Sequence, residues 1–196
     1  MTDKQTFQLL AVLVMLIFYS IYFIKMFSQK KKGIKTNQLG KKKEKDLHLV
    51  ETLMGIGTFS IVGIQLLSII LNVTLLPTHG RIIGFIIAMM GNVVFLISVL
   101  CMKDSWRAGI PEKDKTKLVT RGIYKISRNP AFLGFDIMYM GILLMFFNFG
   151  LLILTIYVMV MLHLQILQEE KYLTKTFGNE YLKYKSQVLR YIGRKS

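Results

Sequence analysis

The longest uncharged run of the chain restricts its fold more than any other feature. Residues 137–168 form a run of 32 amino acids without Asp, Glu, Lys or Arg. As one helix this run would be about 48 Å long, whereas the hydrocarbon core of a bilayer is only about 30 Å thick. Asn148 and Gly150, which favour a turn, lie near its middle. The run therefore predicts a tight hairpin of two membrane-spanning helices.

Three more uncharged runs precede the hairpin. Residues 5–24, 52–80 and 82–102 are 20, 29 and 21 amino acids long, and each is long enough to cross a membrane. We expect the first to be a retained helix rather than a signal peptide, because a lysine cluster follows it. The predicted fold is one all-α domain over residues 1–196, a multi-pass integral membrane protein with five transmembrane helices. The predicted spans cover about residues 5–25, 52–76, 82–102, 131–147 and 150–167.

The basic residues lie in blocks between the apolar runs, which favours a membrane protein over a nucleic-acid-binding one despite the net charge of +15. Residues 25–45, 103–128 and 171–195 hold nine, eight and seven basic residues, and only Lys4 and Arg81 lie elsewhere. Five spans place all three blocks on one side of the membrane, whereas four would move the last block across. The positive-inside rule therefore predicts a cell-membrane protein with its N-terminus outside and its C-terminus in the cytoplasm.

Residues 118–134 form a polar, basic segment between two apolar runs. Gly122 permits a turn that other residues resist. Asn129 and Pro130 stand where the next apolar helix begins, as a favourable N-cap followed by a favourable first helical residue. The free N–H groups of such a helix start suit an anionic group. The segment is either a ligand site at the membrane surface or an ordinary loop that caps a helix.

A second segment, residues 169–193, carries further motif residues. Together the two segments resemble the isoprenylcysteine carboxyl methyltransferase family and the related phospholipid N-methyltransferases, over roughly residues 100–193. Asn129 replaces the histidine and Phe132 the tyrosine that are usual there. The residues that carry the resemblance are Gly122, Tyr124, Arg128, Pro130 and Gly134, then Glu169, Glu170, Leu173, Phe177, Gly178, Tyr181 and Tyr184.

The resemblance implies S-adenosylmethionine as the cofactor, bound between residues 105–134 and 165–193 on the cytoplasmic side. Arg128 can pair with the cofactor's carboxylate, and Glu169 or Glu170 can accept hydrogen bonds from its ammonium or ribose hydroxyls. Apolar and aromatic residues of the first segment can pack on the adenine. The implied cofactor-binding residues are Thr116, Lys117, Leu118, Val119, Tyr124, Asn129, Pro130, Ala131, Phe132 and Glu169.

Arg128, Glu170 and His163 are our candidate catalytic residues. His163 lies seven residues before Glu170 and shares its helix face, so it is either a base or a packing histidine. Gln165 lies four residues before Glu169, where we would expect an arginine in a prenylcysteine enzyme.

Trp106 and Arg107 join Gln165 as candidate residues for the methyl acceptor, although Trp106 is equally suited to be an interfacial anchor. Asp136, within the fourth span, is either functional or solvated near the interface. The single cysteine, Cys101, excludes an internal disulfide and fits no metal site.

We therefore predict a methyltransferase that uses S-adenosylmethionine and acts at the cytoplasmic membrane face. Its expected partners are the lipid bilayer and a lipophilic or small acceptor (an isoprenoid carboxylate, a phospholipid amine or a thiol), with no nucleic acid and no metal. An NADPH-dependent reductase of the sterol-reductase type is an alternative, because it has a similar R-x-P-x-x-x-G segment. A non-catalytic scaffold or a small transporter is another.

Overall fold

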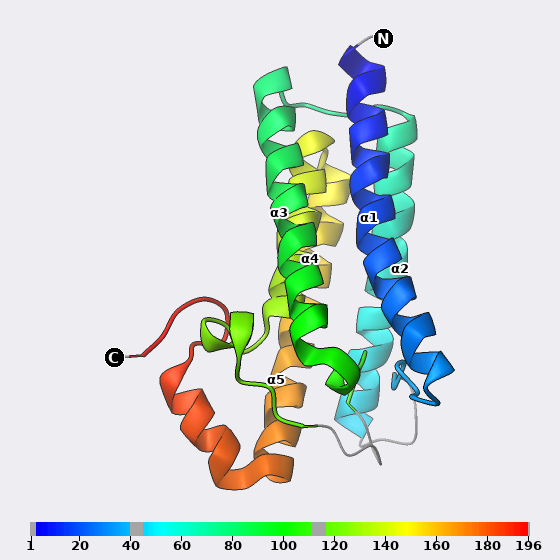
Figure 1. Ribbon diagram of the computed structural model, residues 1–196. Coiled ribbons are helices and arrows are strands. Elements are labelled where there is room, and N and C mark those ends of the chain that lie inside the picture. Colours follow the sequence, from blue (N-terminus) through cyan, green and yellow to red (C-terminus); the bar gives the residue numbers. More distant parts are fainter. Residues whose placement is uncertain (1–2, 40–44, 111–116, 196) are drawn as a thin grey trace.

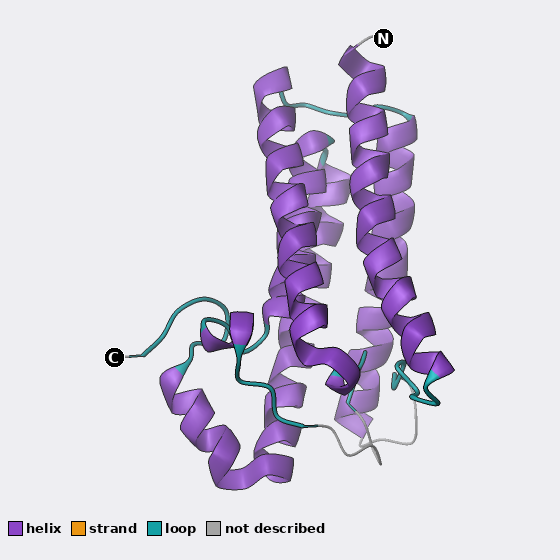
Figure 2. Cartoon of the chain, in the orientation of Figure 1, coloured by secondary structure: helices purple, strands orange, loops and turns teal. Residues whose placement is uncertain are grey.

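The computed structural model describes residues 3–39, 45–110 and 117–195 (Figure 1). Within these ranges all regular elements are helices and no strand forms (Figure 2), so the predicted all-α fold is confirmed. The α-helices are α1 (Asp3–Lys31), α2 (Lys45–Ile70), α3 (Thr78–Met102), α4 (Pro130–Met145) and α5 (Phe149–Gln187), and two short 3-10 helices, η1 (Lys103–Ser105) and η2 (Gly122–Lys125), lie between α3 and α4.

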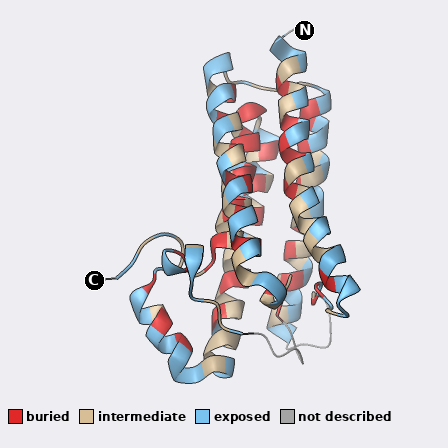
Figure 3. Ribbon diagram, in the orientation of Figure 1, coloured by how far each residue is buried: buried red, intermediate tan, exposed pale blue. Residues whose placement is uncertain are grey.

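The helices form one bundle whose outer surface is apolar. Among the described residues α1, α2, α3 and α5 are long and apolar enough to cross a membrane, and α4 is a shorter apolar helix. Buried residues face the interior of the bundle (Figure 3), whereas Phe59, Ile24 and Ile153 point outward and are 84%, 68% and 69% exposed. Large apolar side chains in such positions suit lipid rather than water. The predicted multi-pass membrane fold is confirmed.

Helices α3 and α4 pack closely because small residues face each other. A Cβ atom on Gly91 would lie 2.5 Å from the backbone nitrogen of Met138, and one on Gly134 would lie 2.8 Å from that of Phe95. These distances leave no room for a side chain. Lipid provides no hydrophobic drive between helices, so close backbone packing of this kind holds spans together.

The turn between α4 and α5 is the predicted hairpin. Asn148 caps α5, since its Oδ1 accepts a hydrogen bond of 2.9 Å from the backbone N–H of Leu151. Its Nδ2 donates to Ser68 Oγ on α2 and to the carbonyl oxygen of Phe146, each at 3.0 Å. The long uncharged run is thereby divided in two, and its turn is fixed against α2.

Several helix limits differ from the predicted spans, most of all those of α1 and α2. Helix α1 continues to Lys31 and α2 begins at Lys45, because charged residues that leave the membrane can stay helical. Helix α2 ends at Ile70 rather than near residue 76. Beyond that end Asn72 has a positive φ of 49°, which breaks a right-handed helix.

Helix α5 continues far beyond the bundle and is broken at Gly178, which has φ 50° and ψ −126°. The chain beyond this break turns back toward the start of α4 (Figure 1). Two hydrogen bonds hold it there: Arg128 N–H donates to the carbonyl of Leu189 at 3.1 Å, and Gly193 N–H donates to that of Ile126 at 2.7 Å. This fold-back brings the two motif segments together.

Candidate active site

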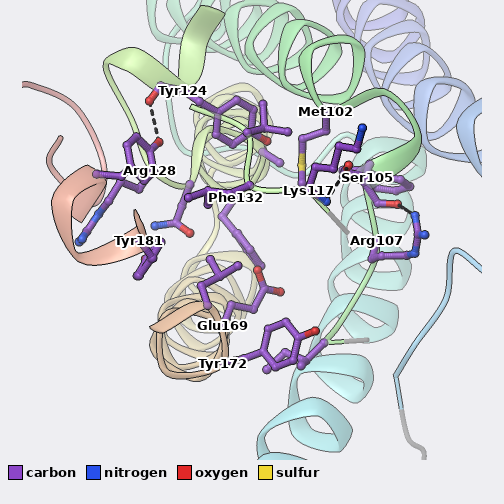
Figure 4. Close-up of a pocket in the computed structure, with 18 of the residues that line it drawn as sticks. Met102, Ser105, Arg107, Lys117, Tyr124, Arg128, Phe132, Glu169, Tyr172 and Tyr181 are labelled. Atoms are coloured by element: carbon purple, nitrogen blue, oxygen red, sulfur yellow. Dashed lines mark hydrogen bonds between the residues drawn. The ribbon is translucent and has the colours of Figure 1, made fainter. Parts of the chain in front are cut away.

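A cavity of about 130 Å³ lies between the α3–α4 connection, the end of α5 and the chain beyond Gly178 (Figure 4). We call it the loop cavity. Its lining residues are Met102, Ser105, Trp106, Arg107, Gly109, Ile110, Lys117, Leu118, Val119, Tyr124, Arg128, Asn129, Ala131, Phe132, Glu169, Tyr172, Leu173, Tyr181 and Tyr184.

The turn at Gly122 places Tyr124 in the wall of this cavity. Gly122 has φ 61°, a backbone conformation that favours glycine, and a Cβ atom there would lie 2.6 Å from Cys101 Sγ, which would have to move. Tyr124 is buried, and its carbonyl oxygen accepts a hydrogen bond of 2.6 Å from Tyr184 Oη. The η2 turn is therefore joined directly to the chain beyond Gly178.

Asn129 stands at the start of α4 but does not cap it with its side chain, contrary to our prediction. Its Nδ2 instead donates to the carbonyl oxygen of Arg190 at 3.2 Å. This bond turns the amide toward the returning chain, and the helix begins with Pro130, which has no N–H that needs a partner. Asn129 thus connects α4 to the C-terminal residues while it lines the loop cavity.

Beside the loop cavity Glu170 is surrounded by three cations. Arg128 Nη2 lies 2.9 Å from Glu170 Oε1, and both side chains are buried. Arg190 donates from Nε and Nη2 to the two carboxylate oxygens at 3.0 and 3.1 Å, and Lys185 Nζ lies 3.8 Å from Oε2. Burial by itself would raise the pKa of the Glu170 carboxyl, but the hydrogen bonds from Arg190 and the surrounding positive charges hold this pKa below its usual value.

Two nitrogen atoms of the Arg128 guanidinium make no hydrogen bond to the described residues. These two atoms, Nε and Nη1, are both buried. A buried guanidinium with unused donors is a site for an anionic group.

A second cavity, of about 370 Å³, lies inside the helix bundle, and we call it the bundle cavity. Phe23 of α1 and Phe59 of α2 form part of its wall and are 46% and 84% exposed, so the cavity reaches the lipid-facing surface. Its lining residues are Tyr19, Tyr22, Phe23, Met26, Asn37, Leu39, Met54, Gly55, Thr58, Phe59, Val62, Trp106, Arg107, Ala108, Gly109, Ala131, Phe132, Phe135, Tyr139, Leu162, Gln165 and Glu169.

The two cavities share a wall. Glu169 is the acidic residue of that wall, and its Oε1 accepts a hydrogen bond of 3.3 Å from Gln165 Nε2. The carboxylate of Glu169 extends toward the open centre of the loop cavity (Figure 4). Gln165 is fully buried, and its Oε1 has no partner among the described residues. The residues common to both linings are Trp106, Arg107, Gly109, Ala131, Phe132 and Glu169.

Most of the predicted site residues meet at these two cavities. Gln165 lines the bundle cavity alone. Pro130 lies in the first turn of α4 and belongs to neither lining, and Thr116 lies outside the described residues. The predicted residues that line the loop cavity are Trp106, Arg107, Lys117, Leu118, Val119, Tyr124, Arg128, Asn129, Ala131, Phe132 and Glu169.

Two of the three candidate catalytic residues lie outside both linings. Glu170 is held in the ion cluster described above. The ring of His163 stacks on Tyr191, with 2.6 Å between Nδ1 and the tyrosine Oη. Both side chains therefore contact the returning C-terminal chain, and their catalytic roles stay predictions.

Several residues of the site carry little signal in the sequence. Tyr181 and Tyr184 belong to the motif, and their spacing of three puts them on one helix face. Arg190 is one charge of a basic block. Nothing in the local pattern indicates that this arginine meets Glu170, because the contact depends on the turn at Gly178. In the described part of the chain no group of three or more His, Cys, Asp or Glu side chains could hold a metal ion.

Residues 79–180 match the sequence model of the family described as phospholipid methyltransferase. Two curated proteins from rice, each named probable protein-S-isoprenylcysteine O-methyltransferase, are also similar, one from Oryza sativa subsp. indica and one from subsp. japonica. Each is 28% identical over 109 residues, which cover 54% of this chain and 57% of the relative. The chain thus matches little more than half the length of these relatives. The family match includes α3, α4, the connection between them and α5 as far as residue 180.

Proposed function

The chain belongs to the phospholipid methyltransferase family, and on that premise we propose that it transfers a methyl group from S-adenosylmethionine to a lipophilic or small acceptor. The observation that carries the proposal is the pair of cavities with a common wall at Phe132 and Glu169. One cavity is lined by charged and aromatic residues beside the motif segments, and the other is largely apolar and reaches the lipid-facing surface. Two reactants of different polarity could therefore meet across one wall.

The residues of the loop cavity fit the chemical groups of S-adenosylmethionine. The unused donors of Arg128 suit its carboxylate. The carboxylate of Glu169 suits the ammonium or the ribose hydroxyls, and Leu118, Val119 and Tyr124 offer apolar surface for the adenine. When bound, the cofactor supplies an electrophilic methyl group on a sulfonium.

The protein's own contribution is to orient the two reactants and to exclude water. Holding two molecules in line replaces a bimolecular encounter and can lower a barrier by about 7–11 kcal/mol. Trp106 and Phe132 line both cavities, and Trp106 is buried against Tyr22 and Phe95. This aromatic wall keeps water away from the reactants. An anionic nucleophile is then attracted to the sulfonium with less shielding by water.

Glu169 is the carboxylate placed to handle a proton at the common wall. An ammonium or thiol acceptor must lose a proton before it can attack, whereas a carboxylate acceptor needs no base. Because Glu169 lines both cavities, it can receive that proton from the acceptor side.

The acceptor proposed for the bundle cavity is an isoprenoid carboxylate, a phospholipid amine or a thiol with an apolar body. The rice relatives are named for isoprenylcysteine. In this chain Gln165 is the polar residue beside Glu169, and an arginine that could pair with a prenylcysteine carboxylate is missing from that position. We therefore propose that prenylcysteine is not the natural acceptor.

We also propose that the protein lies in the cell membrane with its N-terminus outside and both motif segments in the cytoplasm. The support is the distribution of charge, with Lys4 and Arg81 as the only basic residues outside the three blocks. The loop cavity would then face the compartment that supplies the methyl donor.

Titration calorimetry of the purified protein with S-adenosylhomocysteine and with NADPH tests the proposal. We expect S-adenosylhomocysteine to bind and NADPH not to bind. Binding of NADPH alone would favour the reductase instead, and binding of neither would favour a scaffold or transporter.

A further inference from the structure

The C-terminal residues 179–195, which we call the tail segment, form part of the wall of the loop cavity. Tyr181 and Tyr184 line the cavity from this segment, and Tyr184 Oη donates to the carbonyl of Tyr124 on the opposite side. Almost all of the tail segment follows residue 180, where the family match ends. The matched region therefore stops short of most of the segment, although Tyr181 and Tyr184 belong to the motif that carries the resemblance.

The tail segment begins inside α5, and one break in the helix, at Gly178, separates it from the part of α5 in the bundle. Gly178 has φ 50° and ψ −126°, a conformation that residues other than glycine rarely adopt. A Cβ atom on Gly178 would have no heavy atom within 4 Å, so the space on that side of the break is open. Rotation at this one residue can move the tail segment without a clash at the break itself.

At its far end the tail segment is fastened to the residues that begin α4. The Arg190 side chain donates two hydrogen bonds to Glu170, which also pairs with Arg128. The Arg190 carbonyl accepts from Asn129 Nδ2, and the neighbouring Leu189 carbonyl accepts from the backbone N–H of Arg128. Arg190 thus holds, directly or through Glu170, two residues that line the loop cavity.

A second contact fastens the same end to α5. Tyr191 Oη lies 2.6 Å from Nδ1 of His163, and the two rings are stacked. The tail segment is therefore joined to α4 by Arg190 and to α5 by Tyr191, with the ion cluster between them. The Arg190–Glu170 pair is bidentate, which gives it a defined geometry as well as strength.

We propose that the tail segment is a lid over the loop cavity, hinged at Gly178, and that Arg190 is the positioning residue that holds it closed. The inference rests on the proposed function, because the ligand that the lid would enclose is the methyl donor. With the lid closed, Tyr181 and Tyr184 complete the wall and Arg128 is held against Glu170. Loss of the Arg190 side chain weakens binding of the donor, whereas binding of the acceptor in the bundle cavity is unaffected.

Arg190→Ala tests the proposal, with Arg194→Ala as the matched control. Arg194 is an exposed arginine of the same segment, so its variant removes the same charge without touching Glu170. In the ligand-free protein we measure hydrogen exchange at the backbone amides of Arg128 and Gly193, which donate across the junction. Arg190→Ala should speed exchange at both amides, and Arg194→Ala should not.

The second measurement separates positioning from a general loss of structure. Arg190→Ala should weaken S-adenosylhomocysteine binding at least about tenfold, as expected when charged hydrogen bonds are lost. The KM for the acceptor and the thermal midpoint should match those of Arg194→Ala. Arg190→Lys, which keeps the charge but not the bidentate geometry, should bind with intermediate affinity.

Unchanged exchange at Arg128 and Gly193 in Arg190→Ala would overturn the lid, and so would unchanged donor affinity. Failure of the wild-type protein to bind S-adenosylhomocysteine would instead contradict the proposed function. The ligand-free exchange comparison would then still decide whether Arg190 holds the segment closed.

Discussion

Replacing Glu169 by glutamine removes a charge from the common wall of the two cavities and leaves the shape of the side chain. The carboxylate lies among the residues of the loop cavity and accepts a hydrogen bond of 3.3 Å from Gln165. Glutamine keeps the size of the side chain and an oxygen that can accept this bond, so the ligand-free protein should unfold at nearly the same temperature.

Binding of the donor should respond much more strongly to the same substitution. A charged hydrogen bond to a ligand is worth about 1.5–3 kcal/mol, which corresponds to about 10- to 150-fold in affinity. Calorimetry with S-adenosylhomocysteine should therefore show at least about a tenfold weaker Kd for Glu169→Gln. Wild-type affinity in this variant would refute the placement of the donor beside Glu169.

The control must remove a carboxylate without disturbing the lid. Glu170 is unsuitable, because it is buried and pairs with Arg128 and Arg190. Glu180 is exposed and lies outside both cavity linings, so Glu180→Gln should bind S-adenosylhomocysteine as the wild type does.

Three further predictions concern acid, packing and topology. The pKa of Glu170 is held below its usual value of 4.5, so the ion cluster contributes fully above that pH and is lost only as the pH falls through the lower folded pKa. Donor affinity measured by calorimetry should therefore be constant from about pH 7 to about pH 5. A fall in affinity near neutrality would contradict the cluster's role. Gly91→Ala, whose Cβ would lie 2.5 Å from the backbone of α4, should lower the free energy of unfolding by roughly 1–3 kcal/mol, whereas Gly63→Ala, with open space around its Cβ, should not lower it. With Cys101 replaced, a cysteine at the exposed Thr78 should react with an impermeant thiol reagent from outside intact cells, and labelling of a cysteine at the exposed Lys175 would refute the five-span topology.

The bundle and its hairpin could be predicted from the sequence because membrane spans are set by local composition. The 32-residue uncharged run exceeds one bilayer crossing, and Asn148 lies where it must turn. The family resemblance was also readable, since motif residues keep fixed spacings along the chain. The match over residues 79–180 confirms it.

The resemblance already implied Glu169 as a cofactor-binding residue, and Glu169 lines both cavities. Adjacent helical residues point about 100° apart, so Glu170 lies on another face, and its partners there could not be predicted from the sequence. The structure directs Glu169 to the cavities and Glu170 to Arg128 and Arg190. That arrangement depends on the fold-back at Gly178, which joins residues that are distant in sequence.

The bundle cavity also could not be predicted from the sequence. Its wall includes residues of α1 and α2, such as Tyr22 and Thr58, which belong to ordinary apolar runs without a motif. Periodicity identifies such residues as helical but not as neighbours of a site. Only the packing of α1 and α2 against the hairpin brings them to Phe132 and Glu169.

We propose that donor and acceptor occupy two cavities with a common wall. Gly55 lines the bundle cavity but not the loop cavity, and a Cβ atom there would meet no heavy atom within 4 Å. Gly55→Phe should therefore fill the acceptor's space without straining the fold, and S-adenosylhomocysteine should bind it as it binds the wild type.

The most direct test is the initial rate at which purified protein in lipid vesicles transfers radiolabelled methyl groups from S-adenosylmethionine to lipid-extractable product. We predict measurable transfer by the wild type and a rate at least about tenfold lower for Gly55→Phe, equivalent to about 1.4 kcal/mol in the barrier. Equal rates for the two proteins, or no transfer by the wild type to lipid-extractable product in vesicles made from native membrane lipids, would contradict the two-cavity arrangement.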